Sequence, residues 1–287
     1  MNHTPKVLAC VDQSHFADDV ADYAAWAAGR LDAPLEFLHV IDRQAEIPAA
    51  SDHSGAIGFD AQEVLLEELS SQDEARSRAA REQGRVFLNR LRERALSAGL
   101  TAADVRQRYG VLADTLSEQE KDTALFVLGR RGHSAETTQR DLGRNVESVV
   151  RRLRKPILAV TENFRAPRRA LLAFDGRRIT RAGVRLIAQS PLFRGMDVHL
   201  VMSGKPRADG KKQLAWARTT LADAGFDAPT QLIEGDAERV ILRYAQEQSV
   251  DLLIMGAYSH SPLRGLLMGS TTSDLLRAAT VPALLLR

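Results

Sequence analysis

The chain has 287 residues, 44% of them hydrophobic and 26% charged, which is typical of a folded protein of one or two domains. Its 39 Lys and Arg nearly balance its 37 Asp and Glu, so the charge does not favour a nucleic-acid partner. The single cysteine, Cys10, excludes an intrachain disulfide, and no stretch resembles a signal peptide or the roughly 18 apolar residues of a membrane span, so we expect a cytoplasmic protein with no membrane partner.

The first half opens with a short apolar run, KVLACVDQS, which predicts a buried strand followed by Asp12. A helical pattern follows at Phe16 to Leu31, and a second strand, PLEFLHVID, at Pro34 to Asp42. Further along stand two more apolar runs, TALFVLGRRGHS and KPILAV. These runs are continuous rather than alternating, which indicates strands buried on both faces and hence a parallel sheet.

A long excess at about 43–100 separates the second and third strands of this half. Most of it is the stretch FDAQEVLLEELSSQDEARSRAAREQGRVFLNRLRERA, which is amphipathic and rich in Glu and Arg. The pattern predicts one long helix or two. Such a helix could cap its own domain, pack on the other half or offer a surface to a partner.

The second half repeats the order of the first. The strand RALLAFDGR, with Asp175 near its end, matches KVLACVDQS, and a helical pattern and the strand DVHLVMSGK follow it. Later, DLLIMGAYSHS matches TALFVLGRRGHS, and VPALLL matches KPILAV. We therefore predict two α/β domains, 1–163 and 168–287, each a doubly wound, five-stranded and mostly parallel sheet flanked by helices.

Ligands of such sheets bind beyond the carboxyl ends of the strands, where the strand order reverses. In the second half we expect this position to be formed by Asp175, by the end of the second strand at Val201 and Met202, and by the run MGAYSHSPLRGLLMGSTTSDLL after the fourth strand. Gly256 lets a ligand approach the backbone, and the helix predicted to begin near Ser270 and Thr271 offers unpaired N–H groups that suit a phosphate. A plain strand-to-helix turn is the alternative reading.

Other nucleotide and catalytic motifs are absent from the sequence. It has no G-x-x-x-x-G-K-[ST], no G-x-G-x-x-G and no G-x-S-x-G, so a Walker P-loop, a Rossmann NAD site and a hydrolase elbow are unsupported. Ser259 and His260 are adjacent, which is not a catalytic triad. The histidines show no metal-ligand spacing, so we predict no catalytic residue and no metal site.

The segment G256-x-x-S259-x9-G269-S270 resembles the nucleotide-binding signature of the universal stress protein family, which is G-x-x-G, nine residues, then G and Ser or Thr. The aspartate ending the first strand and the closing Val-Pro strand also resemble that family. The resemblance implies a tandem member with an adenine-nucleotide alpha-hydrolase-like fold that binds ATP, with or without Mg²⁺. The residues it implies for nucleotide binding are Asp175, Val201, Gly256, Ser259, Gly269, Ser270 and Thr271.

The sequence departs from that signature in both halves. Ser259 stands where the family has its second glycine. In the first half the loop has ten residues rather than nine, and Gly143 is followed by Arg144 rather than Ser or Thr. The residues of this second candidate site are Asp12, Val40, Gly129, Gly132, Gly143 and Asn145.

Three functions stay open from the sequence. The first is a stress-response protein that binds ATP in its second domain without fast catalysis. The second is an interaction or regulatory protein that binds no nucleotide, and the third is a slow ATPase. We also expect the two domains to pair through the strands KPILAV and VPALLL, which would otherwise be exposed apolar edges, and homodimerisation of the chain is a further option.

Overall fold

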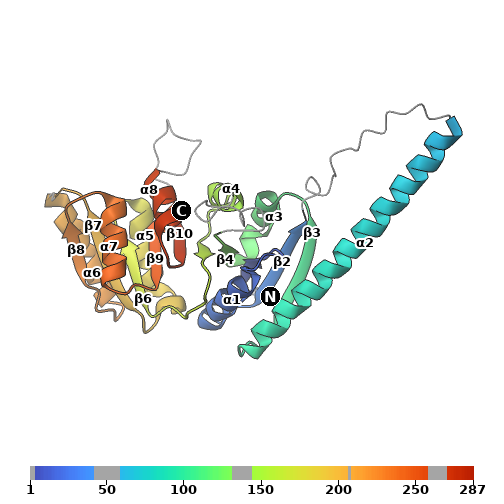
Figure 1. Ribbon diagram of the computed structural model, residues 1–287. Coiled ribbons are helices and arrows are strands. Elements are labelled where there is room, and N and C mark those ends of the chain that lie inside the picture. Colours follow the sequence, from blue (N-terminus) through green and yellow to red (C-terminus); the bar gives the residue numbers. More distant parts are fainter. Residues whose placement is uncertain (1–3, 42–58, 131–143, 206–207, 258–269) are drawn as a thin grey trace.

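The computed structural model describes the backbone of residues 4–41, 59–130, 144–205, 208–257 and 270–287. Within these ranges it describes all side chains except those of residues 59–77, 144–145, 208 and 270–271. Figure 1 shows the described chain as two α/β halves side by side, with one long helix extending from the first half.

Each half alternates strands and helices in the predicted order. The elements of the first half are β1 (Lys6–Cys10), α1 (Ala17–Leu31), β2 (Leu35–Ile41), α2 (Phe59–Ser97), β3 (Ala103–Tyr109), α3 (Leu112–Gln119), the short 3₁₀ helix η1 (Glu120–Asp122), β4 (Thr123–Gly129), α4 (Arg144–Arg152) and β5 (Ile157–Val160). Those of the second half are β6 (Arg169–Ala173), α5 (Arg178–Gln189), the 3₁₀ helix η3 (Pro191–Phe193), β7 (Asp197–Ser203), α6 (Ala208–Ala222), β8 (Thr230–Ile233), α7 (Ala237–Glu247), β9 (Leu252–Gly256), α8 (Ser270–Ala278) and β10 (Ala283–Leu286).

All ten strands belong to one sheet, in the order β3-β2-β1-β4-β5-β10-β9-β6-β7-β8. Within each half the neighbouring strands are parallel, and the order is that of a doubly wound sheet. The strand order reverses between β1 and β4 in the first half and between β6 and β9 in the second. The predicted fold class is therefore confirmed, and the predicted division at 163 and 168 lies between β5 and β6.

The two halves join edge to edge through β5 and β10. These strands are antiparallel, with Leu284 opposite Leu158 and Ala283 opposite Ala159. Every residue of both strands is buried. The predicted pairing of KPILAV with VPALLL thus forms the middle of a continuous sheet, and it removes two apolar edges from solvent.

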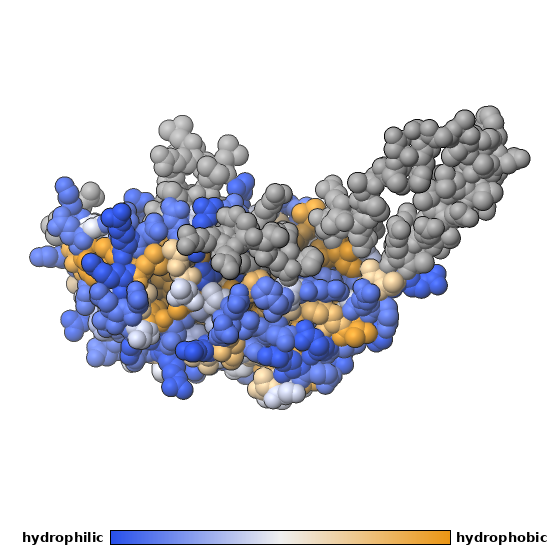
Figure 2. All heavy atoms as spheres, viewed as in Figure 1, coloured by the Kyte–Doolittle hydropathy of each residue, from blue (hydrophilic) through white to orange (hydrophobic). Residues whose placement is uncertain are grey.

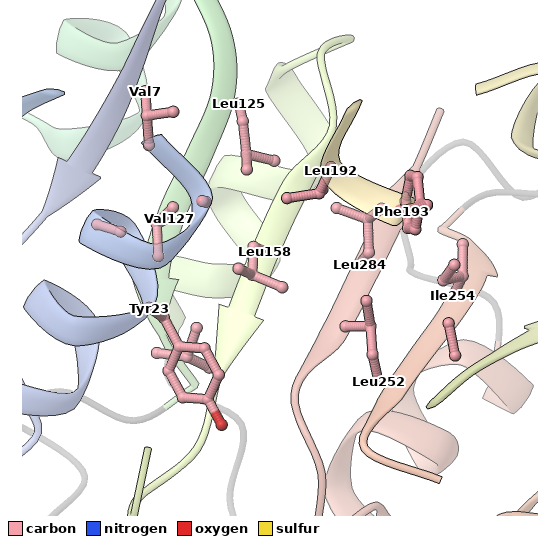
Figure 3. Packing of buried hydrophobic residues seen from close by; sticks show 14 of the residues in the cluster. Val7, Tyr23, Leu125, Val127, Leu158, Leu192, Phe193, Leu252, Ile254 and Leu284 are labelled. Atoms are coloured by element: carbon pink, nitrogen blue, oxygen red, sulfur yellow. The ribbon is translucent and has the colours of Figure 1, made fainter. Parts of the chain in front are cut away.

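Helices cover both faces of the sheet and enclose two apolar clusters. On one face α1, α2, α5 and α6 cover a cluster that continues across the junction (Figure 3), where Leu158 and Leu284 lie between residues of the two halves. On the other face α3, α4, α7 and α8 cover the second cluster. Because both faces are covered, the strands read as the continuous apolar runs seen in the sequence.

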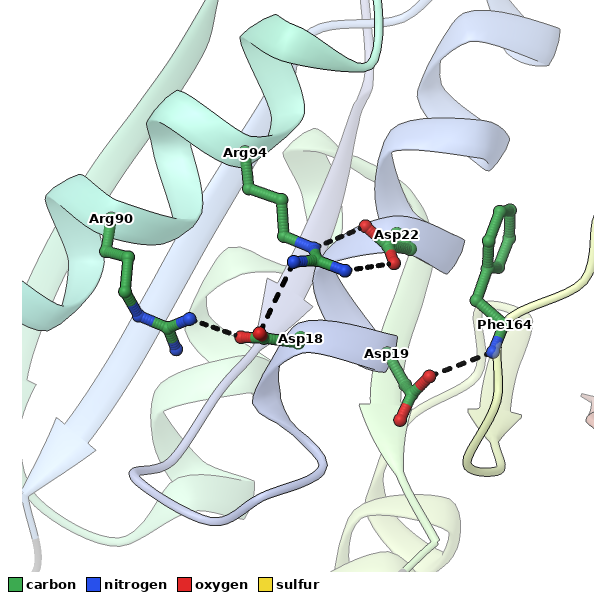
Figure 4. Close-up of polar contacts among 6 residues, drawn as sticks. All are labelled: Asp18, Asp19, Asp22, Arg90, Arg94 and Phe164. Carbon is green, nitrogen blue, oxygen red and sulfur yellow. Dashed lines mark hydrogen bonds and ion pairs between the residues drawn. The ribbon is translucent and has the colours of Figure 1, made fainter.

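The excess in the first half contains a single helix of 39 residues, α2. Its second part packs on its own half, against α1 and β3, and buries Leu88, Leu91 and Ala95. Figure 4 shows the polar contacts with α1: Arg94 reaches both carboxylate oxygens of Asp22, at 2.6 and 2.7 Å. Its first part extends past the sheet (Figure 1).

The surface is mixed in polarity. Figure 2 shows hydrophilic residues over most of the viewed face, with apolar areas between them. In the parts of the chain that the structure describes, no helix is both long and apolar enough to cross a membrane.

Candidate functional site

The hydrogen bonds of the sheet show which positions of the two halves correspond. Val11 N donates to the Leu38 carbonyl, and Phe174 N donates to the Val201 carbonyl in the same way. Leu38 and Val201 are therefore equivalent, and Asp12 and Asp175 each lie one residue beyond the donor in their own half. The two aspartates thus occupy the same place, at the carboxyl end of the first strand beside the switch point.

Asp175 is exposed and is held by the residues that start α5. Its Oδ1 accepts a hydrogen bond from the Thr180 hydroxyl at 2.6 Å and another from Arg177 N at 2.9 Å. The Arg177 side chain lies 3.8 Å from Oδ2. These contacts orient the carboxylate at the strand end while leaving it open to solvent, as a ligand-orienting group requires.

Gly256 ends β9 on the other side of the switch point, where two helices approach it closely. A Cβ at this position would lie 3.2 Å from Ile179 Cγ2, and so would be tightly packed against the first turn of α5. The Gly256 carbonyl accepts a hydrogen bond from the Thr272 hydroxyl at 3.2 Å, which fixes the first turn of α8 beside the strand end. Close packing against α5 therefore favours glycine at position 256, in addition to the predicted approach of a ligand.

Val201 does not line this edge as we predicted. It is fully buried within β7 and belongs to the apolar cluster on the α7 side of the sheet. Because Leu38 corresponds to Val201, the position that corresponds to Val40 is Ser203, two residues later. Both Val40 and Ser203 are only half-buried, so these residues, rather than Val201, stand at the strand end.

The first half places its aspartate similarly, and the residue that follows β4, Arg130, makes a structural contact. The Asp12 carboxylate accepts a hydrogen bond from the Ser14 hydroxyl at 2.5 Å. One residue after Gly129, the buried Arg130 guanidinium donates to the carbonyls of Leu276, Ala279 and Val281, the last two at 2.6 Å each. The loop of the first half thus begins with a side chain that caps the end of α8 in the second half.

Some predicted site residues lie outside the described part of the chain. These are Gly132, Gly143, Ser259 and Gly269. Ser270 and Thr271 are described as backbone at the start of α8, and Asn145 as backbone in the first turn of α4. The described residues therefore bring together Asp175, Gly256 and the first turn of α8, while the remaining contacts of the signature stay predictions.

The sequence interpretation missed Thr180 and Thr272 at this edge. It also missed Arg130 at the carboxyl edge of the first half, which lies on the opposite side of the sheet because β5 and β10 are antiparallel. The hydroxyls could have been found from their places in the first turns of predicted helices, where Thr side chains often bond to nearby polar groups. Arg130 carries no such local signal, because its partners lie about 150 residues away in the chain. Among the described residues, no group of three or more His, Cys, Asp or Glu side chains could hold a metal ion.

Comparisons with known proteins agree on one family. The model of the universal stress protein family matches residues 3–161 and 184–287. A universal stress protein of Synechocystis sp. is 33% identical over 284 residues, which cover 98% of this chain and 99% of that protein. A universal stress protein of Mycolicibacterium smegmatis is 24% identical over 98% of this chain and 96% of its own length.

The fold also has a match among solved structures. A crystal structure of a universal stress protein from Archaeoglobus fulgidus covers 99% of this chain with 97% of its own, at a TM-score of 0.73 and 16% identity. At that identity the likeness concerns the fold, and it extends over both halves.

Proposed function

The chain belongs to the universal stress protein family, and from this premise we propose that its second half binds an adenine nucleotide, ATP in the first instance. The observation that carries the proposal is the arrangement at the switch point between β6 and β9. An oriented, exposed carboxylate, Asp175, lies on one side, and the first turn of α8, tied to Gly256 by Thr272, lies on the other.

Each group at this edge suits one part of a nucleotide. A carboxylate accepts hydrogen bonds from ribose hydroxyls or an adenine amino group, which supports Asp175 as the nucleoside contact. A helix N-terminus offers unpaired N–H groups and positive potential, which supports phosphate binding by the backbone of Ser270 and Thr271 with the preceding Gly269. The proposed site also includes Ser259. Ser203, rather than Val201, is the residue that we propose to lie beside the adenine base.

We propose binding without fast turnover. The Asp175 carboxylate is engaged by Thr180 and Arg177, so it is placed to orient a ligand rather than to remove a proton from water. A magnesium ion, if it accompanies ATP, would be held chiefly by the phosphates, as is common for this ion. A slow ATPase would appear as phosphate release above the buffer rate that is lost in Asp175→Ala.

The test is calorimetric titration of the full chain with ATP, with and without Mg²⁺. We expect one nucleotide per chain, and Asp175→Ala should weaken binding at least about tenfold because it removes a charge-assisted hydrogen bond. Asp12→Ala is the matched control, since it alters the equivalent position of the first half and should leave the affinity unchanged. Absence of binding by the unaltered chain, or an equal loss in both variants, would refute the proposal.

A further inference from the structure

Strand β8 (Thr230–Ile233) forms an open edge of the sheet. It is the last strand of the sheet order, and among the described elements it pairs only with β7 (Figure 1). Its sequence, TQLI, has neither a charged residue nor a proline, both of which protect exposed edges from further pairing. The opposite edge, β3, packs against α2 and carries Arg106 and Arg108, which form ion pairs. Of the two edges, β8 is therefore better suited to accept another strand.

The pairing of β8 with β7 shows which of its backbone groups point outward. Gly204 N donates to the Ile233 carbonyl at 3.0 Å, so the backbone groups of Ile233 face β7. In a parallel pair, successive residues of a strand direct their N–H and C=O groups to opposite sides. The N–H and C=O groups of Thr230 and Leu232 therefore face away from β7. They are the donors and acceptors with which a further strand would pair.

The side chains of these two residues line a groove beside the edge. The groove has a volume of about 610 Å³, runs between α6 and β8, and is also lined by Leu214, Lys211 and Arg218. Lys211 and Arg218 are exposed and stand seven residues apart in α6, which is about 10 Å along the helix. None of the ion pairs between described residues involves either of them. The groove therefore has an apolar floor and a cation toward each end.

The two helices on this side of the sheet extend the positive charge. Together α5 and α6 carry six cationic residues and one acidic residue, Asp209. Arg181 and Arg185 of α5 lie over the Trp216 ring of α6, at 4.2 and 5.6 Å from its centroid. This stacking holds both guanidinium groups beside α6. The positive potential favours an acidic partner at this edge.

Two other occupants fit the edge less well. In a twofold pair of β8 edges, the α6 helices of both copies would lie on the same face, so Lys211 and Arg218 of one copy would approach those of the other. The β3 edge of a second copy would bring Arg106 and Arg108, which are also cationic. A nucleic acid would satisfy the cations, but phosphates donate no hydrogen bond and would leave the outward carbonyls of β8 unpaired.

We propose that the β8 edge binds an acidic, extended segment of a partner protein, which adds to the sheet as a further strand. At about 3.3 Å per residue, positions i and i+4 of a strand share a face and lie about 13 Å apart, within side-chain reach of Lys211 and Arg218. Position i+2 then lies over Leu214 and Leu232. The partner segment is therefore acidic at i and i+4 and apolar at i+2.

The first test is titration of the full chain with a fluorescent synthetic heptapeptide, followed by anisotropy. The peptide has Glu at its second and sixth positions, Val at the fourth and Thr elsewhere. We expect saturation at one peptide per chain. A control peptide with Lys in place of both Glu residues should bind at least about tenfold more weakly, because like charges then face each other.

Two N-methylated peptides test whether the segment binds as a strand. One carries methyl groups on the amides of Glu and Val, and the other carries them on the amides of the Thr residues between. Successive amides of a strand face opposite sides, so only one of these sets faces β8. One methylated peptide should lose at least about tenfold in affinity while the other binds like the parent. Equal effects of the two methylations would overturn strand addition.

The protein variants test the groove. The groove variant, Lys211→Glu with Arg218→Glu, should bind the Glu peptide at least about tenfold more weakly and should prefer the Lys peptide. The control, Arg239→Glu with Arg243→Glu on α7, alters the opposite face of the sheet and should bind like the unaltered chain. Circular dichroism checks that both variants are folded.

Three further results would overturn the inference. The first is absence of peptide binding by the unaltered chain, and the second is an equal loss in the groove variant and the control. The third is that the groove variant loses a different interaction and keeps the peptide. Binding of a single-stranded DNA oligonucleotide, or self-association in sedimentation velocity, would then identify the groove as serving a nucleic acid or a second copy of the chain.

Discussion

At Gly183 of α5 the sheet leaves no room for a side chain. A Cβ there would lie 2.5 Å from Leu286 Cδ1 of β10, whereas a Cβ at Gly29 of α1 would meet nothing closer than Leu100 Cδ2 at 3.7 Å. Both glycines lie in helices, so replacement by alanine removes the same helix-propensity penalty at each. We expect Gly183→Ala to lower the free energy of unfolding by about 1–2 kcal/mol through overpacking.

Gly29→Ala is the matched control and should raise that free energy by about 0.5 kcal/mol, since its Cβ makes only an ordinary contact. Urea unfolding followed by circular dichroism measures both values. Equal shifts in the same direction would mean that helix propensity, rather than the contact with Leu286, decides the effect.

The thiol of Cys10 should be unreactive in the folded protein. It is buried at the end of β1, and burial raises the pKa of its thiol to about 12. The thiol is then neutral at every pH below that value, and it is the thiolate that reacts. We expect no reaction with a chromogenic disulfide reagent at about pH 8 in buffer, and one equivalent in denaturant, where the thiol is free to ionise. Rapid reaction in buffer would show that β1 opens.

The sequence predicted the position of a residue correctly where the residues next to it in the chain indicate the end of a strand. Asp12 and Asp175 follow apolar runs, and both lie at the strand ends as expected. The structure places Val201 inside the strand rather than at its end, because only the pairing of β6 with β7 fixes how far along the strand each residue lies. That pairing is a long-range property, so the apolar run alone could not distinguish Val201 from Ser203.

At the scale of elements, an arginine from each half caps the last helix of the other. Arg130 donates to the carbonyls at the end of α8, and Arg287, at the end of the chain, donates to those of Val150, Arg151 and Leu153 at the end of α4. The last carbonyls of a helix lack partners within it and carry negative potential, so a guanidinium there is favourable. The two caps therefore couple the halves beyond the sheet itself.

We expect Arg130→Ala to lower the free energy of unfolding by about 2–3 kcal/mol, because it leaves buried carbonyls unpaired. Arg287→Ala, at an exposed site, should cost about 1 kcal/mol or less. Arg130→Lys should restore little, since one ammonium cannot reproduce two nitrogens directed at three carbonyls. Urea unfolding of the unaltered chain and the three variants measures these changes in the free energy of unfolding. Equal costs for the two alanine variants would contradict the difference in burial as the cause.

Helix α2 illustrates the limit of prediction at this scale. Its amphipathic sequence predicted one helix or two, and the structure has one, Phe59–Ser97. The sequence left open whether it packs on its own domain, packs on the other half or offers a surface to a partner. The choice is made by contacts far apart in the chain: Arg94 with Asp22, and Gly84, whose absent side chain leaves room for Gln107 of β3. Periodicity marks a helix, but such pairs are visible only once the sheet order is known.

On the scale of the whole molecule, the repeat in the sequence predicted the architecture well, because each half carries the same order of buried strands. It also predicted that KPILAV and VPALLL meet. The joining of both halves into one ten-stranded sheet rests on the antiparallel register of Leu158 with Leu284. No pattern within either half encodes that register. The pairing itself is favourable because both strands would otherwise leave an apolar edge in water.

A shared sheet predicts that the two halves unfold together. The chain has two tryptophans, Trp26 in α1 of the first half and Trp216 in α6 of the second, so Trp216→Phe and Trp26→Phe each leave one fluorescent probe. We expect both probes to report one urea midpoint. Adding Leu158→Ala at the buried junction should lower the free energy of unfolding seen by both probes by about 2–5 kcal/mol, because it leaves a cavity in the apolar cluster that continues across the junction of β5 and β10. Separate midpoints, with only the Trp26 transition shifted, would mean that β5 and β10 join two independent folding units and that the continuous sheet adds little cooperativity.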